Sequence, residues 1–356
     1  MLTTFGKVVK SVELDARKLR ILQAIIDEYI LSAAPVGSRS ISRTAGFNLS
    51  SATIRNEMAD LEEMGFLEQP HTSAGRIPSD KAYRLYVDSI MNRAQLSEDE
   101  LRYLRAHCAK KVDEVDAALK QTAQALSNIT QYTAMVLPPE LDNDRLRHIQ
   151  LVPLMEGKAL VVVVTDTGFA RDAVIRVADR MTTTELEQIS RLLTDRLRGC
   201  RMDLVSERIA EELNEELSGK RSFLNNLVDA IARKIAPSPH DVELSGTGNM
   251  LHYPEYSDLN KARNFLAAVE GWEALYGMLK KASTVEFTFT IGAENEHEPL
   301  RDCSVVTATY RMGDTPVGSL GIIGPTRMNY SKVISVLEYM RRSLSQVLTN
   351  YIEEDK

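Results

Sequence analysis

Cysteine and long apolar runs are both scarce in this sequence of 356 residues. The three cysteines, Cys108, Cys200 and Cys303, are far apart and odd in number, which excludes a disulfide-bonded scaffold and a paired-cysteine metal site. The longest apolar run, Ala159–Thr165, is far shorter than the stretch of about 20 residues that crosses a bilayer. Because no apolar leader follows Met1, we expect a cytoplasmic protein that has no membrane partner.

Motifs for catalysis and cofactor binding are missing as well. The six histidines fall in no metal-binding spacing, and the sequence has no nucleophile elbow and no phosphate-binding loop. The stretch "GTGNML" at 246–251 lacks the third glycine of a dinucleotide-binding loop, and "GSLGIIGP" at 318–325 lies in a strand-like context. We therefore expect no catalytic residue, no metal, no cofactor and no enzymatic activity.

A basic balance, which would favour nucleic acid as a partner, is also absent from the whole chain. The formal net charge is -7. Residues 1–93, however, carry 12 Lys or Arg and 11 Asp or Glu, so the acidic excess belongs to the remainder. A near-neutral N-terminal part on an acidic body permits phosphate binding but does not by itself predict it.

What the N-terminal part does contain is three predicted helices in about fifty residues. Apolar residues recur at helical spacing over 15–31, and "SAAPVGS" then interrupts the helix with Pro35 and Gly37. A short helix from Ser38 to Thr44 or Ala45 and a third from 51 to 64 follow, the latter ending at a glycine. This order is typical of a helix-turn-helix.

The third helix separates an apolar face from a polar one. Ile54, Met58 and Leu61 lie at i, i+4 and i+7 and are expected to face the core. The outward residues near its N-terminus are expected to contact DNA: Ser51, Ala52, Thr53, Arg55 and Asn56. Arginine can bind guanine and asparagine can bind adenine in the major groove, and small residues allow close approach. An ordinary solvated helix face remains the alternative explanation for this set.

A hairpin is predicted directly after the third helix. "GFLEQPHTSAGRIP" contains a short strand, a polar loop and a returning strand, which is the layout of the wing in a winged helix. We expect His71, Ser73 and Arg76 to contact backbone phosphates or a neighbouring minor groove, positioning the protein without specifying sequence. The helices together with the hairpin predict a DNA-binding unit more specifically than either does alone.

The rest of the sequence predicts an α+β body. A helical linker is expected over 94–135, strands over 148–178 and again after 283, and a largely helical segment between them. Sheet before and after a helical stretch suggests one α+β domain that carries an insertion.

The motifs "PVGSRSIS", "SSATIRNEMADLEEMGFLEQPHTSAGRIP" and "DKAYRLYVD" closely resemble the heat-inducible transcription repressor family HrcA. One departure is Ala82, where glycine would be expected. The resemblance implies an α+β multidomain fold: a winged-helix DNA-binding domain at 1–93, a linker at 94–135, a GAF-like domain at 136–204 and 283–356, and an inserted dimerisation domain at 205–282. It also implies a homodimer that binds double-stranded DNA at an inverted-repeat operator of chaperone genes and is kept active by the chaperonin.

Apolar residues in the 205–282 segment are the expected dimerisation surface, although the core of the domain is an equally good explanation for each of them. The residues expected to form this surface are Phe265, Val269, Trp272 and Tyr276. Since GAF-like domains commonly bind ligands, a second hypothesis keeps the DNA-binding unit and makes the body a small-molecule sensor.

Overall fold

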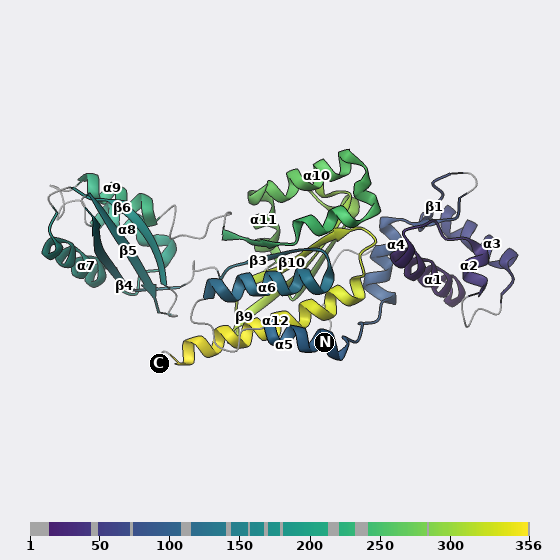
Figure 1. Ribbon diagram of the computed structural model, residues 1–356, viewed down its shortest axis with the longest axis horizontal. Coiled ribbons are helices and arrows are strands. Elements are labelled where there is room, and N and C mark those ends of the chain that lie inside the picture. Colours follow the sequence, from purple (N-terminus) through teal and green to yellow (C-terminus); the bar gives the residue numbers. More distant parts are fainter. Residues whose placement is uncertain are drawn as a thin grey trace.

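The computed structural model of the protein contains three packed units (Figure 1). The N-terminal unit lies at one end, a unit built on a five-stranded sheet lies in the middle, and a unit built on a three-stranded sheet lies at the other end. The described residues are 14–43, 49–71, 74–107, 115–139, 144–155, 157–166, 170–178, 181–212, 221–231, 241–282 and 285–354.

The N-terminal unit contains the three helices that the sequence predicts and a two-stranded antiparallel sheet. Its elements are α1 (Ala16–Ser32), α2 (Ser38–Arg43), α3 (Ser51–Glu63), β1 (Leu67–Glu68), β2 (Ile77–Pro78), α4 (Asp80–Leu85) and the π-helical turn η1 (Tyr86–Ile90). Each long helix turns one apolar stripe inward, because residues three or four apart share a face. Ile21 and Ile25 of α1 meet Ile41 of α2 and Ile54 of α3 in a fully buried core. Ala82, the departure noted above, is buried in α4.

The five-stranded unit is an antiparallel sheet between helical layers. Its strands are β3 (Thr133–Leu137), β7 (Glu243–Ser245), β8 (Phe287–Ile291), β9 (Cys303–Met312) and β10 (Thr315–Pro325), in the order β7-β3-β10-β9-β8. Helices α6 (Val115–Thr130) and α12 (Tyr330–Glu354) pack on one face, and α11 (Trp272–Ala282) packs on the other beside α10 (Leu259–Glu270). The central strands β9 and β10 are buried on both faces, so burial is continuous along most of each strand instead of alternating, and it includes the hydroxyl side chains of Ser304, Thr307, Thr309 and Ser319.

Short helices complete this unit. They are α5 (Glu98–His107) and the 3₁₀ turns η5 (Thr247–His252), η6 (Pro254–Ser257), η7 (Gly292–Glu294) and η8 (Glu298–Leu300). Leu104 of α5 and Leu119 and Leu126 of α6 are buried. The segment expected to be a helical linker therefore packs as a layer of the unit in its described part.

The three-stranded unit has a sheet of its own with helices on one face. It comprises β4 (Leu146–Met155), β5 (Lys158–Thr165), β6 (Ala170–Arg176), α7 (Thr183–Leu197), α8 (Met202–Glu212) and α9 (Arg221–Ala230). Alternate residues of β5, such as Ala159, Val161 and Val163, are buried beneath the helices. The opposite face of the sheet includes Val152 and Val174, which are 38% and 45% exposed.

Strand pairing differs from the expected division of the body. The expectation placed 136–204 and 283–356 in one domain and 205–282 in an insertion. In the structure, β3 pairs with β7 and β10, whereas β4, β5 and β6 form a separate sheet. Helices α10 and α11 lie on the five-stranded unit. Alternation along a sequence identifies a strand but not its partner, so the sequence pattern could not separate the two sheets.

Candidate nucleic-acid interface

Helix α3 is held at both ends by local hydrogen bonds. The Ser50 hydroxyl accepts a bond from the Thr53 amide at 3.1 Å, as an N-cap residue does. At the other end, Gly65 adopts a φ of +77°, and the Phe66 amide donates to the Leu61 carbonyl at 2.8 Å. These bonds fix where the helix starts and stops, and therefore which residues its first turns present.

The polar face predicted for α3 is present and largely open. Ala52, Arg55 and Asn56 are exposed, while Ser51 and Thr53 are half-buried. The Thr53 hydroxyl lies 2.9 Å from the Ser50 hydroxyl and so belongs to the cap. Within the described part of the chain, neither Arg55 nor Asn56 makes a hydrogen bond or an ion pair, so both side chains are available to a ligand.

Three acidic side chains of α3 are neutralised by cations of neighbouring elements. Lys18 of α1 lies 2.7 Å from Glu57 and 2.9 Å from Asp60. The hydrogen bonds to Glu57 and Asp60 raise the pKa of the Lys18 ammonium above its ordinary value. On the other side of the helix, the Arg76 Nε lies 2.7 Å from a Glu62 carboxylate oxygen. These pairs reduce the repulsion that unpaired carboxylates would exert on a phosphate backbone.

The hairpin is attached to the turn before α2 as well as to itself. Leu67 pairs with Pro78 and Glu68 with Ile77. Val36 and Arg76 then exchange both backbone hydrogen bonds, at 2.9 and 2.8 Å. Gly75 makes this contact possible, because a Cβ at this position would lie 2.3 Å from the Val36 carbonyl oxygen. The hairpin thus lies beside α3 in a fixed position.

The three hairpin residues expected to contact DNA differ in how far the structure leaves them open to it. His71 is exposed near the tip, whereas Ser73 lies outside the described residues. The Arg76 side chain is only 20% exposed and is engaged by Glu62. Its position supports the attachment of the hairpin to α3, so a contact with phosphate would have to compete with this ion pair.

Two arginines that sequence reasoning did not select also lie in this unit. Arg39 and Arg43 are exposed on α2, which packs against α3. The spacing in "SRSISR" could have identified them, because two arginines four residues apart share one side of a helix. Ile41 between them is buried, so the arginines lie on the outer side. We add both to the candidate interface.

The residues expected to form a dimerisation surface lie partly in the interior. Phe265 is completely buried and Val269 is 6% exposed, so both belong to the chain's own core. Trp272 and Tyr276 are half-buried and pack against that core. The helical period of α10 and α11 could not distinguish a core face from a partner face.

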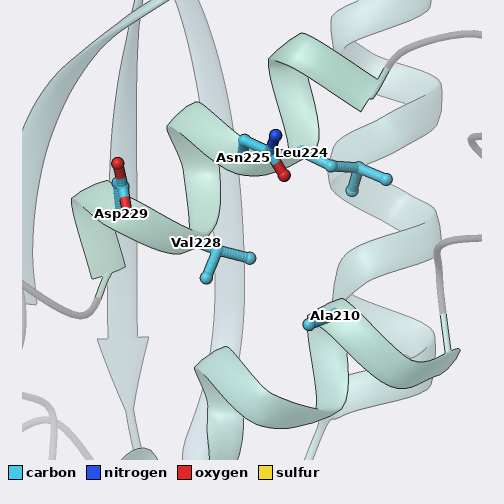
Figure 2. Close-up of a pocket in the computed structure, with 5 residues that line it drawn as sticks. All are labelled: Ala210, Leu224, Asn225, Val228 and Asp229. Carbon is cyan, nitrogen blue, oxygen red and sulfur yellow. The ribbon is translucent and has the colours of Figure 1, made fainter.

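One pocket, of about 350 Å³, lies between α8 and α9 of the three-stranded unit. Figure 2 shows Leu224, Asn225, Val228 and Asp229 on one helix and Ala210 on the other. Its polar lining is one amide and one carboxylate, fewer groups than a small-molecule sensor would use to orient a ligand. Among the described residues, no cluster of histidine, cysteine or acidic side chains could hold a metal, and no helix is long and apolar enough to span a membrane.

Comparisons with known proteins agree along almost the entire chain. The family model described as "HrcA protein C terminal domain" matches residues 116–334. The "Heat-inducible transcription repressor HrcA" of Pelotomaculum thermopropionicum is 42% identical over 342 residues, covering 96% of this chain and 98% of that protein. The protein of the same name from Acetivibrio thermocellus is 41% identical over 345 residues, with coverage of 96% and 98%. A crystal structure of a hypothetical protein is 26% identical with a TM-score of 0.67, covering 95% of this chain and 99% of that one.

Proposed function

This chain belongs to the family of heat-inducible transcription repressors named HrcA, and from that premise we propose that it represses chaperone genes by binding an inverted-repeat operator as a homodimer. The N-terminal unit would be a winged helix-turn-helix in which α3 enters the major groove. The five-stranded unit would be the GAF-like domain, and the three-stranded unit would be the inserted dimerisation domain.

One observation carries the assignment of α3. On its exposed face, Arg55 and Asn56 have no partner among the described residues, and they lie next to the small side chain of Ala52. An arginine and an asparagine in the first turns of a recognition helix match guanine and adenine edges, and a small neighbour permits close approach. The paired carboxylates Glu57 and Glu62 leave the phosphate-facing sides of the helix without strong repulsion. His71, Arg39 and Arg43 would bind phosphates around it.

An inverted repeat requires a two-fold symmetric protein, so the dimer surface matters to specificity. We place this surface on the open face of the three-stranded sheet instead of on α10 and α11. Val152, Leu160 and Val174 form one cross-strand row there, and Leu154 and Met155 are 48% and 65% exposed nearby. An exposed apolar row across a sheet, here flanked by the Lys158–Arg176 row, is typical of an interface, whereas Phe265 and Val269 are already covered. The inserted unit would accordingly span 144–231 among the described residues.

Dependence on the chaperonin is the part of the proposal that rests on family membership. The exposed apolar face of the three-stranded sheet offers a physical basis for this dependence. A protomer that has lost its partner exposes Val152, Val174 and Met155 to water, which favours aggregation or capture by a chaperone. Repression would then follow the fraction of chain that the chaperonin keeps folded and paired.

Binding of the Arg55→Ala variant to operator and to scrambled duplex tests the assignment of α3. A bidentate contact with guanine contributes about 1–3 kcal/mol, so operator affinity should fall about 5- to 150-fold while affinity for scrambled DNA changes much less. Arg102→Ala is the matched control, because Arg102 is an exposed arginine paired with Asp99 on α5, outside the N-terminal unit. Equal losses on both duplexes would assign Arg55 to phosphate contacts and remove the central support of the proposal.

A further inference from the structure

The N-terminal unit contacts the five-stranded unit through residues of α1 and α4, in addition to the chain segment that connects the two units. We propose that Arg84 and Arg327 hold the N-terminal unit in one orientation, and that these positioning residues set the spacing between operator half-sites that the dimer accepts. This inference rests on the proposed function, because spacing has meaning only for a protein that binds two half-sites.

The first contact joins α4 to the turn η7. Arg84 donates from Nε to a Glu294 carboxylate oxygen at 2.8 Å, and its Nη2 forms an ion pair with the other oxygen. Nη2 also donates to the Phe289 carbonyl at 2.9 Å. One planar guanidinium thus bonds both a side chain of η7 and the backbone of the preceding strand β8, which fixes direction as well as distance.

Asp80, at the start of the same helix, adds a second bond to this turn. Its carboxylate accepts a hydrogen bond from the Ala293 amide at 2.8 Å. Gly292 precedes that amide with a φ of +51°, and a Cβ there would lie 2.1 Å from an Asp80 oxygen. The turn therefore receives α4 closely, and a larger residue at position 292 would adopt a strained φ and displace the Asp80 carboxylate from the Ala293 amide.

The second contact joins the C-terminal end of α1 to the loop between β10 and α12. Arg327 donates from Nη1 to the Ile30 carbonyl at 2.9 Å. Its Nε and Nη2 form an ion pair with the two carboxylate oxygens of Glu255, and Arg327 has only 7% of its surface exposed. Ile30 lies in the last turn of α1, where carbonyls have no partner within the helix, so the arginine also satisfies a helix end.

The two contacts involve different helices of the N-terminal unit, α4 and α1. Between them, the buried Tyr83 of α4 packs against Tyr330 of α12, with ring centroids 5.9 Å apart. The connecting segment is also fixed, because Ser335 of α12 donates to the Ala94 carbonyl at 2.7 Å. The two contacts fix the orientation together, because a unit joined to the body at only one of these points can rotate about that point. In Figure 1, α4 lies between the three preceding helices and the five-stranded unit.

A fixed orientation has a direct consequence for DNA binding. In a two-fold dimer, the distance and angle between the two α3 helices would be set by the body and transmitted through these contacts. Half-sites must then lie a fixed number of base pairs apart, since each helical turn of about 10 base pairs rotates the major groove once. Weakening the contacts would let each N-terminal unit adjust to a shifted half-site.

Operator duplexes whose half-sites are moved apart by zero to about five base pairs test this inference with the full-length protein. A shift of about five base pairs places the second half-site on the opposite side of the DNA. Wild-type affinity should fall at least about tenfold over this series, while Arg84→Gln and Glu294→Gln should lose no more than about threefold. All three proteins should bind a duplex with a single half-site equally well.

Glu296→Gln is the matched control. Glu296 lies two residues after Glu294, and its exposed ion pair is with Lys281 of α11, within the five-stranded unit. It should keep the wild-type spacing profile. Arg84→Gln and Glu294→Gln remove the same pair from opposite sides, so a shared result cannot come from damage to one element. If both variants retain the wild-type profile, or if the wild type itself is indifferent to spacing, the inference is overturned. A wild-type protein that binds no half-site at all would instead contradict the proposed function.

Discussion

Replacing Gly75 by alanine should detach the hairpin from the turn before α2. The added Cβ would lie 2.3 Å from the Val36 oxygen, 2.5 Å from the Val36 carbonyl carbon and 2.8 Å from the Pro35 carbonyl carbon. All three are backbone atoms, so no side-chain rotation can relieve the overlap. The segments must separate, which breaks the two backbone hydrogen bonds between Val36 and Arg76.

The size of the effect follows from those two bonds. Each contributes about 0.5–1.5 kcal/mol, so the attachment should lose about 1–3 kcal/mol. Hydrogen exchange of the Val36 and Arg76 amides measures the attachment directly, and the same free energy predicts exchange about 5- to 150-fold faster. Operator affinity should fall as well, because a displaced hairpin no longer holds His71 beside α3.

Gly37→Ala is the control for this prediction. Gly37 lies directly after Val36, but a Cβ there would meet nothing within 4 Å. We expect its stability to change by less than about 1 kcal/mol, with exchange at Val36 and Arg76 unaltered. The same exchange rates in Gly75→Ala as in Gly37→Ala would refute the claim that this glycine maintains the contact.

Two further predictions concern the dimer and pH. Val174→Asp should shift the sedimentation coefficient from that of a dimer to that of a monomer, because it places a charge in the proposed interface. Leu266→Asp, on the exposed side of α10, should leave the dimer intact. Dissociation by Leu266→Asp alone would instead place the dimer surface on α10 and α11. The hydrogen bond from Lys332 holds the pKa of Glu100 below its ordinary 4.5. The ion pair therefore stabilises the docking of α5 on α12 fully above that value, and this stabilisation is lost as pH falls through the lowered pKa. The protection of the α5 amides, measured against the intrinsic exchange rate at each pH, should therefore fall in acid. Lys332→Met should reduce this dependence, because only the hydrogen bonds from Ser97 then lower the pKa of Glu100. An unchanged acid sensitivity in that variant would contradict the prediction.

Local features of the N-terminal unit could be predicted from sequence, because neighbours in the chain determine them. The spacing of Ile54, Met58 and Leu61 gave the buried face of α3, and the glycine at 65 gave its end. Arg55 and Asn56 were then placed outward by the helical period alone. These predictions depend on interactions within a few residues, which a sequence displays directly.

Features that depend on distant partners could not be predicted in this way. The pairing of Arg76 with Glu62 requires knowing where the hairpin folds, and the sequence alone suggested a free phosphate ligand. The strand at 133–137 falls at the end of the segment that was expected to be a helical linker, and its partners β7 and β10 lie far along the chain. Phe265 has the spacing of an interface residue and of a core residue, and only the packing of α10 decides between them.

The claim on which the account depends is that the exposed side of α3 contacts base edges. Selection of preferred sequences from randomised duplexes, with the wild type and with Asn56→Ala, tests it most directly. Because alanine has no amide to bind a base edge, we expect the variant to lose its base preference at one position in each half-site, placed symmetrically, and to retain the preference elsewhere. An unchanged preferred sequence at unchanged stability would show that this side of α3 does not determine which DNA the protein binds.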